Sequence, residues 1–240
     1  MAGIVVKPRA RILHGHDWVF SGEVLKVFGQ PADGDVISLK DGRDHLLGSA
    51  IYNSKSQIVA RRFSRRRQNL DLDFFQRRIA QAIEYRARRG VNPRLCRMVW
   101  SESDGLPGVI VDRYGDVLVL QTLTLAMDMR KALIVEALAT AGGTPALQSI
   151  IERNDAVVRR AEGMEPQVSV LFGEAPAETE IEVAGLRLSL ISCMRRRPAS
   201  TWTSFRIMRA SHVTLRDGAC SIASRAREYL RWLAPERGRR

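Results

Sequence analysis

Short apolar stretches alternate with turn residues over the first 63 positions, and helical periodicity is almost absent there. The pattern predicts five strands, at Gly3–Lys7, Glu23–Phe28, Asp35–Lys40, Leu46–Tyr52 and Gln57–Phe63. Turn residues such as Pro31–Gly34 and Asp41–Gly42 separate them. Several short, evenly spaced strands are typical of a small barrel, and we therefore expect a β-barrel over residues 1–68.

Helical spacing replaces this pattern after Arg67. Apolar residues recur at a period near 3.6, at Leu72, Phe75, Ile79, Ala82 and Ile83. Asp71 and Asp73 stand where such a helix would begin, and Gly90 and Pro93 stand beyond its end. We expect a connector helix within residues 69–93.

Residues 94–190 predict a second unit that mixes strands with one helix. The expected strands are Val109–Asp112, Val117–Thr122, Ser149–Glu152, Glu180–Val183 and Leu186–Leu190, and the expected helix is Met127–Ala141. The element order strand–strand–helix–strand–strand is typical of an α+β layer. The fold class is therefore mixed, with a barrel followed by an α+β middle domain.

Charge divides the chain differently. The net charge of +12 is the sum of +8 in residues 1–90, −5 in residues 91–190 and +9 in residues 191–240. A strongly basic balance is typical of proteins that bind nucleic acid. The last fifty residues have neither period 2 nor period 3.6, and we expect them to be poorly ordered.

Other features exclude several classes of protein. No apolar run reaches the length of a membrane span, and no signal sequence opens the chain, so we expect a cytoplasmic protein with no membrane partner. Cys96, Cys193 and Cys220 lie far apart, which favours neither a disulfide framework nor a zinc site. Glu102, Asp104 and Asp112 lie in a turn-rich stretch without nearby His or Cys, and we interpret them as structural.

Two basic segments stand out, residues 7–16 around a glycine turn and residues 61–67 where the predicted barrel ends. The first and fifth strands of a small barrel are often neighbours, so we expect the two segments to share one face. Arginine and lysine can contact phosphates, glycine lets an RNA backbone approach, and histidine can stack or donate a hydrogen bond. The predicted RNA-binding residues are Lys7, Arg9, Arg11, Gly15, His16, Arg61, Arg62, Arg65 and Arg66. Trp18 and Phe20 are expected in the barrel core. The alternative, in which the cations form only a solvated rim, stays open.

Five segments together resemble one family. They are Lys7–Pro8, Gly15–Gly22, Tyr52–Ile58, Glu102–Asp116 and Glu152–Asp155, and the fourth is the most specific. They resemble the bacterial ribosomal-RNA cytosine-5 methyltransferases that carry an N-terminal PUA domain. The resemblance implies a PUA barrel that binds ribosomal RNA and a small middle domain. It also implies a C-terminal Rossmann-like domain that binds S-adenosylmethionine and holds the catalytic cysteine.

The resemblance ends near Leu188. The family continues with Gln-Lys-Thr-Gly-Phe-Tyr-Leu-Asp and a glycine-rich cofactor loop, and neither is present. If the codons for Met194–Thr203 are translated in a reading frame that starts one base earlier, they can encode that eight-residue motif. We therefore expect residues 191–240 to be a frameshifted tail and the Rossmann-like domain to be missing or scrambled.

The predicted function follows from these points. The chain is expected to be the RNA-binding portion of a 23S rRNA cytosine-5 methyltransferase, with no catalytic residue, no metal and no bound S-adenosylmethionine. The alternative is a stand-alone PUA protein whose native basic tail adds affinity for RNA. A homodimer is left open beside a monomer.

Overall fold

The computed structural model describes residues 2–141, 147–174, 176, 178–183, 186–191 and 207–210. The strands are β1 (Gly3–Val6), β2 (Trp18–Phe20), β3 (Val24–Phe28), β4 (Val36–Lys40), β5 (Leu46–Tyr52), β6 (Ile58–Ser64), β7 (Leu95–Trp100), β8 (Val109–Tyr114), β9 (Val117–Thr122), β10 (Ser149–Asn154), β11 (Gln167–Gly173), β12 (Glu178–Val183), β13 (Leu186–Ile191) and β14 (Ile207–Ala210). The α-helices are α1 (Leu72–Arg88), α2 (Leu125–Asp128), α3 (Lys131–Thr140) and α4 (Val158–Ala161).

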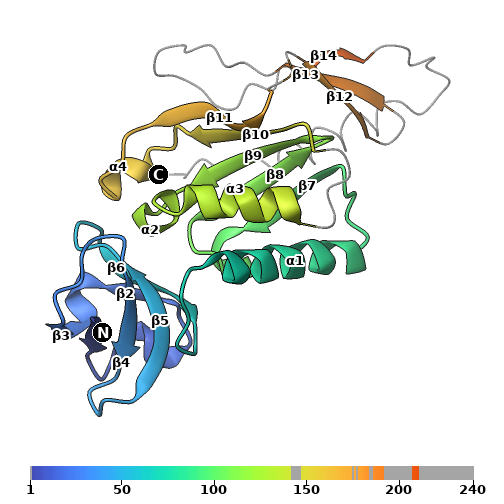
Figure 1. Cartoon of the computed structure of the whole chain (residues 1–240). Helices are drawn as coiled ribbons and strands as arrows, with labels where there is room; N and C mark the ends of the chain where they lie inside the picture. Colours follow the sequence, from blue (N-terminus) through green and yellow to red (C-terminus); the bar gives the residue numbers. More distant parts are fainter. Residues whose placement is uncertain are drawn as a thin grey trace, which may run out of the picture.

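The first six strands form one sheet, in the order β2-β6-β5-β4-β1-β3, which curls into a half-barrel (Figure 1). The five predicted strands are all present, with ends that differ by one residue or less. The sixth strand, β2, was not predicted because three residues are too few to show alternation. The half-barrel encloses a core of small and branched residues that includes Ile4, Val19, Ile37 and Ala60.

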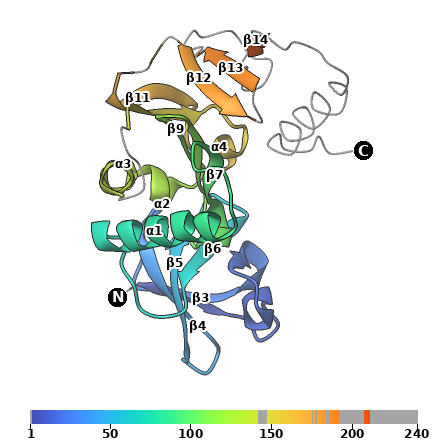
Figure 2. The same cartoon turned by 90° about the vertical axis from the view of Figure 1, so that its right-hand side faces the viewer.

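A second sheet has the order β11-β10-β9-β8-β7, and α1 and α3 cover one face of it (Figure 2). The predicted hairpin of β8 and β9 is confirmed, and β9 pairs in parallel with β10. The predicted helix Met127–Ala141 is instead two helices, α2 and α3, which Met129 and Arg130 separate. The two edge strands of this sheet, β7 and β11, were not predicted from the sequence.

Helix α1 does more than connect the two sheets. The Asp71 carboxylate accepts a hydrogen bond from the backbone N of Phe74 at 2.8 Å, so it caps the helix where the sequence indicated. The buried face of α1 then packs against α3 and β7. Ile51 and Phe63 of the half-barrel join the same hydrophobic cluster. Residues of both sheets therefore meet in this cluster, which fixes the half-barrel against the second sheet.

A third sheet corrects the predicted α+β layer. The hairpin of β12 and β13 exists, but it pairs with β14 and not with the second sheet. β14 lies within the segment 191–240, whose other residues after Ile191, including Cys193 and Cys220, are outside the described residues.

Candidate nucleic-acid interface

The pairing of β2 with β6 brings the two basic segments together. Trp18 lies opposite Arg61, so the loop that precedes β2 lies beside the end of β6. Arg62 donates a hydrogen bond to the His16 carbonyl across this contact, at 3.3 Å. The sequence suggested that strands 1 and 5 of the barrel would be neighbours. That expectation is wrong, because β1 pairs with β3 and β4 while β6 pairs with β2 and β5.

Most of the predicted RNA-binding residues lie on the surface of this region. The exposed ones are Lys7, Arg9, Arg11, Gly15, His16, Arg65 and Arg66. Gly15 ends a short 3-10 helix with φ of 97°, a conformation that favours glycine. A Cβ built on Gly15 would have no neighbour within 4 Å, so the surface is open there. Arg9, Arg65 and Arg66 form no ion pair within the described part of the chain.

Arg61 and Arg62 have different surroundings. Arg62 is buried, and its guanidinium pairs with Asp17 at 2.8 Å. The Arg61 side chain is only 13% exposed and contacts the carboxylates of Glu102 at 3.2 Å and Glu162 at 3.5 Å. Both charges are matched inside the chain, so these two arginines have less charge to offer to a phosphate than their neighbours.

Trp18 and Phe20 do not lie in the core, and this corrects the sequence-based expectation. Side chains alternate along a strand, and in β2 it is Val19 that points inward and is fully buried. Trp18 is 37% exposed, and its indole Nε1 donates a hydrogen bond to Glu102 Oε1 at 3.0 Å. Arg61 lies 5.3 Å from the centre of the indole ring.

The acidic stretch around Glu102 forms ion pairs with arginines of the chain. Asp104 forms a bidentate ion pair with Arg86, with N–O distances of 2.9 and 2.7 Å. Asp112 forms a bidentate ion pair with Arg97, with N–O distances of 2.8 and 3.1 Å. No group of three or more potential metal ligands occurs among the described residues.

Glu102 joins the two sheets. Burial alone would raise the pKa of its carboxyl group, but hydrogen bonds from Ser101 and Trp18 and the charge of Arg61 outweigh burial, so the pKa lies below its ordinary value. Glu102 is therefore ionised at neutral pH, when it can hold both Trp18 and Arg61.

Two further contacts hold the half-barrel on the second sheet. Asn53 Nδ2 donates to the carbonyl and carboxylate of Glu162, at 3.0 and 2.9 Å, and Arg130 donates to the Gly34 carbonyl at 2.9 Å. The hollow between Asn53, Arg61 and Glu162 has room for about one water molecule. A nucleotide cannot enter there.

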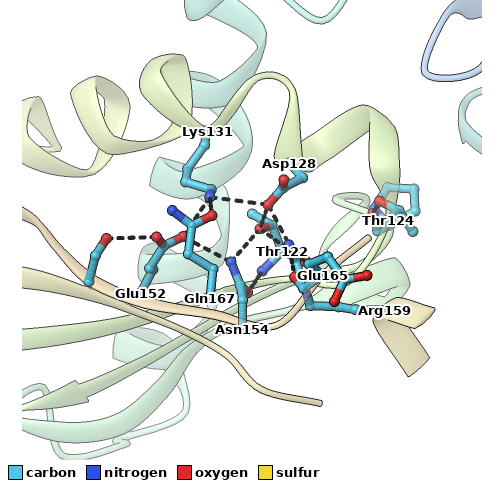
Figure 3. A network of polar contacts seen from close by, with 11 residues as sticks. Thr122, Thr124, Asp128, Lys131, Glu152, Asn154, Arg159, Glu165 and Gln167 are labelled. Carbon is cyan, nitrogen blue, oxygen red and sulfur yellow. Dashed lines mark hydrogen bonds and ion pairs between the residues drawn. The ribbon is translucent and has the colours of Figure 1, made fainter. Parts of the chain in front are cut away.

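A second polar cluster lies in the other sheet (Figure 3). Arg159 is 2% exposed, and it donates to Asp128 at 2.9 Å and to the Thr122 carbonyl. Asn154 bonds Thr122 and Glu152, and Lys131 pairs with Asp128 at 3.2 Å and Glu152 at 2.5 Å.

This cluster occupies the carboxyl ends of the parallel strands β9 and β10. Thr122 and Asn154 are the last residues of those strands. Open α/β sheets bind nucleotides and related cofactors outside such ends. Here Asp128 and Arg159 fill the position, and every buried polar side-chain atom of the cluster has a partner. These residues do not fit an adenosyl cofactor.

The comparisons with known proteins agree with the half-barrel. Residues 4–65 match a family model described as a PUA-like domain. The chain is 39% identical over 181 residues to "Ribosomal RNA large subunit methyltransferase I" of Aeromonas hydrophila, which covers 72% of this chain and 44% of that relative. The Vibrio cholerae protein of the same name is 38% identical over 192 residues, with coverages of 78% and 47%. The chain therefore spans about half the length of the curated relatives it matches.

Solved structures share the fold. A putative SAM-dependent methyltransferase from Streptococcus mutans matches with a TM-score of 0.63 and 19% identity, over 80% of this chain and 48% of that one. A putative methyltransferase complexed with SAH matches with a TM-score of 0.64, also at 19% identity. Within the described residues, no helix is long and apolar enough to cross a membrane.

Proposed function

We propose that this chain is an RNA-binding protein that recognises ribosomal RNA of the large subunit through its half-barrel. The observation that carries the proposal is the β2–β6 pairing, which places the exposed cations of both basic segments on one region of the surface. The PUA-like match covers the same residues, and the names of the similar curated proteins supply the class of RNA.

The proposal divides the predicted RNA-binding residues into two groups. Exposed Lys7, Arg9, Arg11, Arg65 and Arg66 contact phosphates, while Gly15 and His16 border them. Arg61 and Arg62 position this surface through their carboxylate partners. Proteins that bind RNA through phosphates lose affinity steeply as salt concentration rises, and this surface should do so.

We further propose that the chain methylates nothing on its own. The loss of resemblance after Leu188 supports this, because the resemblance places the cofactor-binding domain beyond that residue. In the intact relatives the methyl donor would be S-adenosylmethionine and the target the C5 atom of a cytosine. A frameshift near residues 188–190 accounts for the missing motifs, with residues 191–240 as its product. The DNA beyond codon 188 tests this: an open displaced frame with a glycine-rich loop supports a frameshift, and stop codons contradict it.

Filter binding of the purified chain to a fragment of large-subunit ribosomal RNA tests the RNA proposal. The double variant Arg9→Ala/Arg65→Ala should bind about tenfold more weakly, because two phosphate contacts are lost. A matched control removes two exposed arginines of α1, in Arg77→Ala/Arg88→Ala, and should bind like the native chain. An equal loss of RNA affinity in both variants would contradict a binding surface on the half-barrel. Transfer of labelled methyl groups to the RNA would contradict inactivity.

A further inference from the structure

The half-barrel exposes an aromatic residue in the middle of its basic surface. Trp18 lies on β2, an edge strand of the sheet, and it is 37% exposed. Exposed cations lie on either side along the chain, at Arg9 and Arg11 before β2 and at Arg65 and Arg66 after β6. The pairing of Trp18 with Arg61 places the indole between these two groups.

The indole is held in a fixed orientation. Its Nε1 donates to Glu102, and Glu102 is in turn held by Ser101 and Arg61. The Arg61 guanidinium lies over the ring at 5.3 Å from its centre. Phe20 meets the indole edge-on at 6.4 Å, and Arg11 lies 4.4 Å from the centre of the Phe20 ring. An aromatic ring fixed before binding loses little conformational freedom when a ligand stacks on it.

We propose that Trp18 is a stacking platform for an unpaired base of the bound RNA, while exposed arginines of the two basic segments contact the RNA backbone. The proposal rests on the proposed function and adds the class of RNA. Bases stack on aromatic side chains only where they are splayed out of a helix, since a continuous duplex covers their faces. The occupant is therefore RNA with a single-stranded or bulged nucleotide. The hydrogen bond to Glu102 ties the indole to the second sheet.

The second sheet offers a matched control. Trp100 is 42% exposed, and Arg97 lies 5.1 Å from the centre of its ring, so its exposure and its arginine resemble those of Trp18. It lies on β7, outside the half-barrel. A general effect of losing an exposed tryptophan would appear at both positions.

The experiment measures fluorescence anisotropy with two labelled RNA hairpins whose stems are closed by a non-nucleotide linker, one with a single bulged nucleotide and one fully paired but otherwise identical. Trp18→Ala should weaken binding to the bulged hairpin about tenfold and leave the paired hairpin within about twofold. Trp18→Phe, which loses the hydrogen bond to Glu102 but keeps a ring, should retain most of the affinity. Trp100→Ala should change neither.

Each remaining outcome decides between the two proposals. If the native chain binds neither hairpin, the proposed function fails and the platform fails with it. If the native chain binds both hairpins and Trp18→Ala lowers them equally or not at all, RNA binding stands and the platform is overturned. Loss in Trp18→Phe equal to that in Trp18→Ala also overturns stacking, because the missing feature is then the hydrogen bond.

Discussion

Two clusters of arginines and carboxylates in this chain differ in how far they are open to solvent. The cluster around Arg159 in the second sheet is closed, and each of its buried polar side-chain atoms has a partner within the chain. The cluster around Arg61 is closed on the side of Glu162 and open on the side of Trp18, which is 37% exposed. The same residue types therefore form a closed network in one place and border the proposed RNA-binding surface in the other.

This difference in exposure decides whether an arginine affects stability or RNA affinity. A buried pair contributes little net stability when both partners are present, but the loss of one partner leaves an uncompensated buried charge. An exposed arginine costs little to remove and is available to a phosphate. Stability and RNA affinity should consequently respond to different arginines.

The largest expected effect is on the closed cluster. Arg159→Met removes the hydrogen bonds from the buried guanidinium to Asp128 and to the Thr122 and Glu165 carbonyls. Lys131 still pairs with Asp128, but several buried groups lose a donor at once, and we expect the free energy of unfolding to fall by about 3–5 kcal/mol. Urea unfolding measures this. The neighbour Arg160 is exposed, and Arg160→Ala should change stability by less than about 0.5 kcal/mol. If both variants lost a similar amount of unfolding free energy, the closed cluster around Arg159 would not be the source of the effect.

A smaller loss is expected at the half-open cluster. Arg61→Met leaves Glu162, whose side chain is 4% exposed, without its cation, but Asn53 still donates to that carboxylate. We expect a loss of about 2 kcal/mol in the same unfolding measurement, because one charged hydrogen-bond partner is removed and another remains. Arg65→Ala, four residues further on, should be neutral. If Arg61→Met left the free energy of unfolding unchanged, Arg61 would belong with the exposed arginines that are proposed to contact phosphates.

The sequence predicted the half-barrel well, since turn residues and short apolar stretches mark five of its six strands. It predicted α1 and its Asp71 cap for the same reason, a local pattern that tertiary contacts do not override. The three-residue strand β2 left no such pattern, and the two basic segments were consequently joined through the wrong strand.

The partners of the arginines could not be predicted. Arg61, Arg62, Arg65 and Arg66 look alike in the sequence, and only the fold shows that the first two face carboxylates. Glu102 lies 41 residues from Arg61 and 84 from Trp18, and a pairing at that separation leaves no periodic pattern. Trp18 was expected in the core on hydrophobicity alone, although alternation along β2 turns it outward.

The most direct test of the central claim is the salt dependence of RNA binding. The account predicts that log K against log salt concentration becomes shallower by about 1.5 in Arg65→Ala/Arg66→Ala, because two phosphate contacts are lost, while the free energy of unfolding is unchanged. Arg77→Ala/Arg88→Ala on α1 should keep the native slope. An unchanged slope in Arg65→Ala/Arg66→Ala, or an equal change in the α1 variant, would contradict the assignment of RNA binding to the half-barrel.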